Sequence, residues 1–154
     1  MDVSDLIAPN AVIGSLKANS KKQAILALAE KAAELTGLEE RQILETLLQR
    51  EKLGSTGVGG GIAIPHGKIA KLDRIFGLFA RLAKPIDFEA LDDQPVDLIF
   101  LLLAPETAGA DHLKALARVA RHLREPGVAP NLRGSDDRTA LYAVLTQGAT
   151  PNAA

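Results

Sequence analysis

The chain has 154 residues, of which 47% are hydrophobic and 24% are charged, and its formal net charge is -1. This length and composition are typical of one globular domain with a substantial core. The near-zero charge gives no reason to expect a nucleic acid or an anionic membrane surface as partner, and the absence of cysteine excludes disulfides, thiolate catalysis and cysteine-based metal sites.

The first predicted elements are a short strand over residues 12–16 and a helix that follows it. Ser20 is a candidate N-cap with Gln23 three residues later, the spacing of a capping box. Apolar residues then recur at helical spacing as far as Gly37, a residue typical of a helix C-terminus. We expect a second helix over residues 39–52, whose last turn carries two cations that suit the helix dipole.

A glycine-rich loop follows, with five glycines among the eight residues 54–61. Glycine permits positive φ and lets backbone amides approach a ligand, and clustered amides can form an anion-binding concavity. The loop leads into a short apolar strand over 62–64 that stops at Pro65, and His66 comes next. Histidine is a nucleophile and a proton carrier near neutral pH. The pattern indicates a histidine that handles phosphate.

Two further strands and two helices are predicted in the rest of the chain. The strands cover residues 75–82 and 96–103, and the second is almost wholly apolar, as expected of a central strand covered on both faces. The helices cover residues 108–123 and 135–147, with Ser135 as the cap of the last one. The expected inward stripe of the first of these helices is Leu113, Leu116, Ala117, Ala120 and Leu123.

This alternation of helices and strands predicts a single layered α/β domain over residues 1–154, with a core at about 6–147 and a flexible tail at 148–154. The N-terminal sequence has neither the basic region nor the apolar region of a signal peptide. The longest nearly apolar run, residues 96–105, contains Asp97 and is too short to cross a bilayer. We expect a cytoplasmic protein without direct membrane insertion.

The glycine-rich loop fits none of the common nucleotide or hydrolase motifs. A P-loop requires glycine five residues before its Gly-Lys pair, and the position five before Gly67 is Ile62. The Rossmann spacing fails at the same isoleucine, and the loop precedes a strand rather than a helix. A G-x-S-x-G elbow is absent because Leu53 lies two residues before Ser55.

Residues 54–67, G-S-T-G-V-G-G-G-I-A-I-P-H-G, resemble the phosphoacceptor signature of the EIIA domains of the bacterial phosphotransferase system, in the fructose–mannitol group. The likeness is greatest to the stand-alone nitrogen-related EIIA and extends over about residues 6–145. The flanking Arg50-Glu51 agrees, and a second histidine, His112, lies 46 residues after His66, as in the family. Gly60 departs from the pattern, because many members of that branch have Asn at this position. Glycine lacks the side-chain hydrogen bond of Asn, and we expect this loss to soften the loop.

The resemblance implies the EIIA fold, with a mixed β-sheet flanked by helices, and the chemistry of a phosphocarrier without a cofactor. His66 would accept a phosphoryl group from an HPr-like phosphohistidine protein. His112 would stabilise the phosphate from the first turn of its helix, beside the positive end of the dipole. The expected phosphate-binding residues are Arg50, Ser55, Thr56, Gly57 and Lys68.

Some of these residues also have simpler structural explanations. A lone histidine at a strand end is more often structural than catalytic, and only the full motif reverses that preference. Arg50 suits a helix C-terminus as a cation, and the phosphate role of Lys68 is no more favoured than a purely structural one. We expect Asp111 to be an N-cap and His122 to lie on the surface. No set of His, Asp or Glu has metal-ligand spacing, so we expect no metal. A solvated turn is expected for Asp87, Glu89, Asp92 and Asp93.

Two classes of function compete. In the first, the phosphorylation state of His66 controls binding to regulated proteins; in the second, the phosphoryl group passes to a separate sugar-specific EIIB. The chain ends at Ala154 without an attached EIIB or membrane domain, which favours regulation. A third, less favoured alternative is a non-phosphorylated relative that binds a small anion in the same loop.

Overall fold

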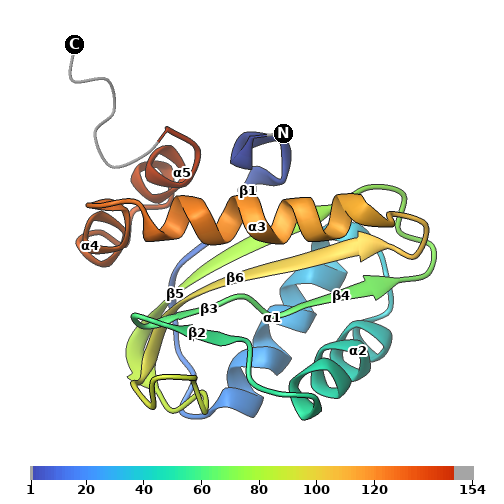
Figure 1. Ribbon diagram of the computed structural model, residues 1–154, viewed down its shortest axis with the longest axis horizontal. Coiled ribbons are helices and arrows are strands. Elements are labelled where there is room, and N and C mark those ends of the chain that lie inside the picture. The colour runs from blue at the N-terminus through green and yellow to red at the C-terminus, as the bar shows by residue number, and fades with distance from the viewer. Residues whose placement is uncertain (1, 148–154) are drawn as a thin grey trace.

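A six-stranded mixed sheet forms the centre of the computed structural model, which describes residues 2–147 (Figure 1). The strand order is β1-β5-β6-β3-β2, and β4 also pairs with β6. β1 is parallel to β5, β5 is antiparallel to β6, and β3 and β4 are both parallel to β6. The strands are β1 (Ile7–Leu16), β2 (Gly57–Gly59), β3 (Ile62–Ala63), β4 (His66–Ile69), β5 (Phe76–Ile86) and β6 (Val96–Pro105).

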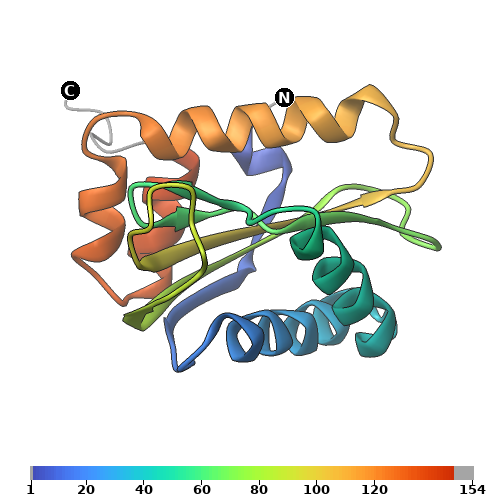
Figure 2. The ribbon, with the colours of Figure 1, turned by 60° about the horizontal axis from the view of Figure 1, so that its bottom comes forward.

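Helices cover both faces of this sheet, as Figure 2 shows: α1 and α2 lie on one face and α3 crosses the other, with α4 and α5 at one end. The mixed α/β fold flanked by helices is therefore confirmed. The predicted flexible tail at 148–154 lies outside the described residues. A short 3-10 helix, η1 (Val3–Asp5), precedes β1, and the α-helices are α1 (Lys21–Thr36), α2 (Glu40–Lys52), α3 (Ala110–Arg124), α4 (Val128–Arg133) and α5 (Arg138–Gln147).

The core lies against β6, whose residues are all buried except Asp97, which is half-buried. The prediction of a central strand is confirmed, because such a strand is covered by helices on both faces and has no solvent-facing side. Phe79 of β5 lies opposite Phe100 of β6 and both are fully buried.

The predicted start and end of α1 are confirmed. The hydroxyl of Ser20 accepts from the Gln23 amide at 3.2 Å, and Gly37 ends the helix with a φ of 78°. The Gln23 side chain bonds to the amide of Asn19 at 2.8 Å rather than to that of Ser20, so the reciprocal half of the capping box is displaced by one residue.

The predicted inward face of α3 is confirmed only in part: Leu123 is buried and Leu116 and Ala120 pack partly buried against the core, but the other two predicted residues are exposed. Leu113 is 67% exposed, whereas the buried residues are His112, Ala115, Val119, His122 and Leu123. The apolar pattern alone did not predict the full buried face, because two of the buried positions are the histidines His112 and His122. The prediction that His122 is a surface residue is also wrong, since its Nε2 donates to the carbonyl of Val144 at 2.9 Å.

Caps in the C-terminal third differ from the predictions. The N-cap of α3 is Gly109, with a φ of 57°, and Asp111 lies in the first turn instead. The predicted last helix begins at Arg138, where Asp137 accepts from the Ala140 amide at 2.8 Å. The additional helix α4 was missed because it carries Pro130, which is tolerated in a first turn whose amides have no intrahelical partner.

Candidate functional site

A break in the sheet presents His66. β3 and β4 pair in parallel with successive parts of β6, and Ile64-Pro65 separates them. Proline has no amide proton to contribute to the sheet, although its carbonyl accepts from the Leu102 amide at 2.9 Å. His66 thus begins β4, opposite Leu102, rather than simply ending the strand that follows the loop.

The two ring nitrogens of His66 have different partners. Nδ1 lies 2.8 Å from the carbonyl oxygen of Ile64; a carbonyl can only accept, so Nδ1 carries the proton. Nε2 accepts from Nε of Arg50 at 3.2 Å, so the lone pair is on Nε2. This fixes one tautomer of the neutral ring.

The surroundings of His66 favour the neutral ring. Burial is the largest cause and lowers the pKa of His66 below its usual value of 6.5. The Ile64 carbonyl and the Glu51 carboxylate act in the opposite direction, while the charge of Arg50 lowers the pKa further. Near pH 7 the ring is therefore a neutral nucleophile.

Close approach of α2 to β4 places Arg50 beside His66. A Cβ atom at Gly67 would lie 2.5 Å from Cγ2 of Thr46, so only glycine permits α2 to pack this tightly at that point. Arg50 lies in the last turn of α2, and its Nη1 also donates to the carbonyl of Gly54 at 3.0 Å. The guanidinium thus joins the helix, the glycine-rich loop and the imidazole.

The second histidine lies beside the first. The ring centroids of His66 and His112 are 5.5 Å apart, with an angle of 52° between the planes. His112 is in the first turn of α3, and burial lowers its pKa, with smaller contributions from His66 and Lys68. Lys68 lies two residues after His66 on β4 and is exposed. The structure therefore brings both histidines and two cations to one edge of the sheet.

The hydroxyl groups of the loop are used within the protein. Ser55 Oγ donates to the carbonyl of Phe88 at 2.7 Å and accepts from the amide of Gly57 at 3.0 Å. The Thr56 hydroxyl and amide both donate to the carboxylate of Glu51. These donors, which the sequence predicted to bind phosphate, are thus engaged in this conformation. A Cβ at Gly57 would lie 2.8 Å from that of Ala90.

Two charged residues beside the loop were missed as part of the site. Glu51 is paired with Lys21 of α1 at 2.9 Å, and the Glu51 side chain is only 6% exposed. The adjacency of Glu51 to Arg50 in the sequence was a usable signal, whereas Lys21 lies 30 residues earlier and carried none.

The predicted solvated turn is confirmed, and one of its residues also supports the loop. Its residues are exposed, but Asp92 accepts from the amide of Gly60 at 3.0 Å, and this bond is the largest cause that lowers the pKa of Asp92. From the other side, Arg133 of α4 donates to the Gly60 carbonyl at 2.6 Å and to both oxygens of Asp97 at 2.8 and 3.0 Å. The tip of the loop is thus held through both the amide and the carbonyl of Gly60.

Two kinds of feature are absent from residues 2–147. In that part of the chain, no group of three or more His, Cys, Asp or Glu side chains is placed to hold a metal ion. Among the helices described, none has the length and apolar character needed to cross a membrane.

Comparison with known proteins gives consistent matches over nearly the whole chain. A family model described as phosphoenolpyruvate-dependent sugar phosphotransferase system, EIIA 2, matches residues 5–148. A nitrogen regulatory protein of Bradyrhizobium diazoefficiens is 66% identical over 145 residues, which are 94% of this chain and 95% of that protein. A fructose-specific EIIA component of Haloferax volcanii is 36% identical over 151 residues, 96% and 98% of the two chains.

A solved structure agrees with these matches. The crystal structure of nitrogen regulatory protein IIA-Ntr from Neisseria meningitidis superposes with a TM-score of 0.86 at 33% identity and covers 92% of this chain and 97% of that one. The similarity therefore includes the three-dimensional arrangement described above.

Proposed function

Because the chain belongs to the EIIA type 2 family of the phosphoenolpyruvate-dependent sugar phosphotransferase system, we propose that it is a phosphohistidine carrier whose acceptor is His66. The observation that carries the proposal is the state of the His66 ring. Its Nδ1 proton is held by the Ile64 carbonyl, and the lone pair on Nε2 faces Arg50. Nε2 is therefore the proposed site of phosphorylation.

In the proposed reaction, Nε2 of His66 attacks the phosphorus of a phosphohistidine on an HPr-like protein. A new N–P bond forms as the donor N–P bond breaks, and its electron pair returns to the donor imidazole. His66 keeps its Nδ1 proton, and the Ile64 carbonyl stabilises the resulting imidazolium. Such a transfer needs in-line positioning and charge stabilisation more than covalent chemistry from the protein.

The surrounding cations and donors supply that stabilisation. Arg50 leaves Nε2 as the new bond forms and follows the phosphoryl oxygens, to which its fork of donors is suited. His112 and Lys68 add a donor and a positive charge on the other side. We assign Ser55, Thr56 and Gly57 to holding the loop, because the hydroxyls of the first two and the amides of the last two are already used within the protein.

The direct test is phosphate uptake. With labelled phosphoenolpyruvate, enzyme I and HPr, the wild type should gain an acid-labile, base-stable phosphate, and His66→Ala should gain none. His122→Gln is the matched control, because it removes a histidine that bonds to Val144 away from this site. Label on His66→Ala would refute the assignment, and nitrogen-15 chemical shifts of the labelled ring would identify Nε2 or Nδ1.

We propose that the phosphorylation state of His66 regulates partner proteins. A phosphoryl group adds about -1.5 to -2 charges at neutral pH, enough to change which surfaces bind around the site. The 66%-identical relative is named a nitrogen regulatory protein, which supports this role. Pull-downs with the phosphorylated and unphosphorylated protein should recover different partners, and identical sets would argue against regulation through His66.

The second candidate is transfer of the phosphate to a separate sugar-specific EIIB. It is favoured by the 36%-identical relative named a fructose-specific EIIA component. Incubation of the labelled protein with purified fructose and mannitol EIIB domains separates the two roles. Rapid loss of label to either domain would support sugar transport, and retention would support regulation.

A further inference from the structure

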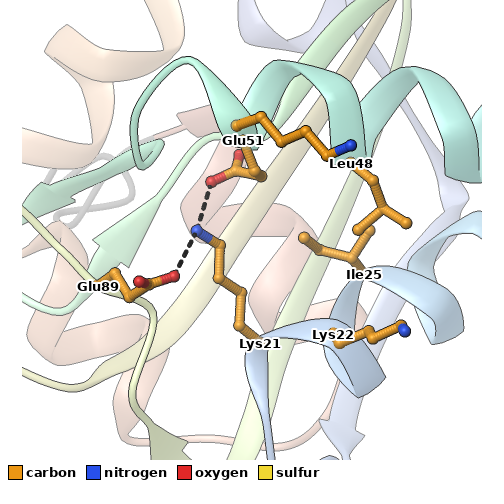
Figure 3. A pocket seen from close by; sticks show the side chains of 7 residues that line it. Lys21, Lys22, Ile25, Leu48, Glu51 and Glu89 are labelled. Atoms are coloured by element: carbon orange, nitrogen blue, oxygen red, sulfur yellow. Dashed lines mark hydrogen bonds and ion pairs between the residues drawn. The ribbon is translucent and has the colours of Figure 1, made fainter.

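Behind the phosphoacceptor loop, the start of α1, the end of α2 and the loop itself meet in one network of Lys21, Glu51 and Thr56. Glu51 accepts from the amide and the hydroxyl of Thr56, one with each carboxylate oxygen. Lys21 lies 2.9 Å from the same carboxylate, and Figure 3 shows its ammonium group between Glu51 and Glu89. The network therefore ties the start of α1 and the end of α2 to the loop.

Burial makes this network more than a surface ion pair. The side chain of Glu51 is 6% exposed, that of Lys21 is 16% exposed, and Thr56 is 3% exposed. The Lys21 ammonium also lies 5.0 Å from the centroid of the Phe88 ring. A buried carboxylate needs both a counter-charge and hydrogen-bond donors, and here it has both.

The position of Glu51 links the network to the reacting group. Glu51 follows Arg50 directly in the last turn of α2, so the residue that holds the loop and the residue that contacts His66 share one stretch of backbone. The carboxylate is also near enough to raise the pKa of His66. An unpaired anion at that place would repel an incoming phosphoryl group, and Lys21 supplies the charge that neutralises it.

We propose that Glu51 is a positioning residue for phosphoryl transfer and that Lys21 is the counter-ion that makes a carboxylate tolerable there. This inference rests on the proposed function of His66. Glu51 holds Thr56 and, through the backbone, orients Arg50 towards Nε2. A carboxylate suits this task because its two oxygens accept both Thr56 donors at once, which a single amide oxygen does in poorer geometry.

The surroundings of the network make it testable by substitution. Lys21 and Glu51 line an open cavity of about 560 Å³, together with Lys22, Leu48 and Lys52. Neutral replacements are therefore solvated from the cavity instead of leaving a sealed void. We expect Glu51→Gln, Lys21→Met and the double variant to fold. The matched control is Glu45→Gln, which removes an exposed carboxylate of α2 paired with Arg41 at 3.7 Å.

The experiment measures the maximal rate of phosphate uptake, the half-saturating concentration of phosphorylated HPr, and the pKa of His66 by NMR titration. Glu51→Gln should lower the maximal rate about tenfold or more with the half-saturating concentration unchanged, and should lower the pKa of His66. Lys21→Met should also slow uptake but raise that pKa, because it leaves the carboxylate uncompensated. The double variant should return the pKa towards the wild-type value.

General destabilisation would not shift the pKa of His66 in opposite directions in Glu51→Gln and Lys21→Met while slowing phosphate uptake in both. A Glu51→Gln variant that matches Glu45→Gln in both rate and pKa would overturn the inference. Phosphoramidate, a small chemical phosphoryl donor, provides a second arm that needs no protein docking. If wild type takes label from neither donor, the proposed function fails; if wild type is labelled and Glu51→Gln is labelled equally fast, only the present inference fails.

Discussion

Nε of Arg50 lies 3.2 Å from Nε2 of His66, on the lone pair that would attack phosphorus. In the proposed reaction the guanidinium lies in the path of the incoming phosphoryl group and moves before the N–P bond forms. Its second bond, from Nη1 to the Gly54 carbonyl at 3.0 Å, keeps it near the site during that movement. Arg50 thus covers Nε2 in this structure and, in the proposed reaction, would bind the phosphate.

Replacement of Arg50 should change both the pKa of His66 and the rate of phosphate uptake. In Arg50→Met the pKa of His66 should rise, because the charge that lowers it is lost, and phosphate uptake should slow about 100-fold, as for loss of one charge-stabilising donor. Arg50→Lys should restore part of the pKa effect but little of the rate, since lysine lacks the planar fork. NMR titration and single-turnover labelling measure the two effects; equal rates in all three proteins would remove Arg50 from the mechanism.

His112 should accelerate transfer without being an acceptor. Its ring centroid lies 5.5 Å from that of His66, close enough to donate to a phosphoryl oxygen once the group is in place. We expect His112→Gln to lower the rate of uptake about 10- to 100-fold while His66 still becomes fully labelled at long times. A wild-type rate in this variant would show that His112 has no part in the reaction.

Stability should decrease in mild acid because of the two histidines. Both have a folded-state pKa below the ordinary value of 6.5, so below that pH the unfolded chain binds more protons than the folded one. The free energy of unfolding should therefore fall as the pH drops from 6.5 through the folded-state values. Urea unfolding between pH 7.5 and 5 measures this, and the double variant His66→Gln/His112→Gln should have a flatter profile; an unchanged slope would contradict the burial argument.

The two glycines at the tip of the loop should respond differently to substitution. At Gly61, with a φ of 80°, a Cβ would lie 2.4 Å from Nη2 of Arg133, so Gly61→Ala should lower the free energy of unfolding by about 2 kcal/mol. At Gly60, with a φ of 67°, nothing lies within 4 Å, and Gly60→Asn should change it by about 0.5 kcal/mol at most. Denaturant unfolding compares them, and equal losses would show that local space is not decisive.

His122 should matter for stability alone. Its Nε2 donates to the carbonyl of Val144 and so joins α3 to α5. His122→Ala leaves that carbonyl without this partner and should cost about 1–3 kcal/mol, while phosphate uptake by the folded protein stays at the wild-type rate. Arg121→Ala, at the exposed neighbouring position, is the control; a fall in uptake rate for His122→Ala would indicate a coupling between α5 and the site.

Local sequence signals predicted much of the fold. Ser20, Gly37 and the apolar run of β6 were sufficient because caps and periodicity depend on neighbouring residues. The signals failed where tertiary contacts decide: His122 is buried because α5 supplies a carbonyl, and α4 forms around a proline. Strand β4 was also unrecognised, since pairing with β6 and not its own short sequence makes it a strand.

The residues of the site also fall into two groups, those that the sequence motif predicted and those that depend on tertiary contacts. The family motif predicted His66, His112 and Arg50, and the structure brings these three together. The phosphate roles of Ser55 and Thr56 followed from their place in the motif, whereas their hydrogen bonds depend on Phe88 and Glu51. Lys21 was beyond sequence reasoning, because its partner is 30 residues away and only the packing of α1 against α2 joins them.

The tautomer of His66 depends on a main-chain atom, the carbonyl oxygen of Ile64. Every amino acid has that oxygen, so no point substitution at position 64 deletes it, and only a change of backbone course at the Ile64-Pro65 break could displace it. The tautomer that leaves Nε2 unprotonated therefore does not depend on which side chain stands at position 64.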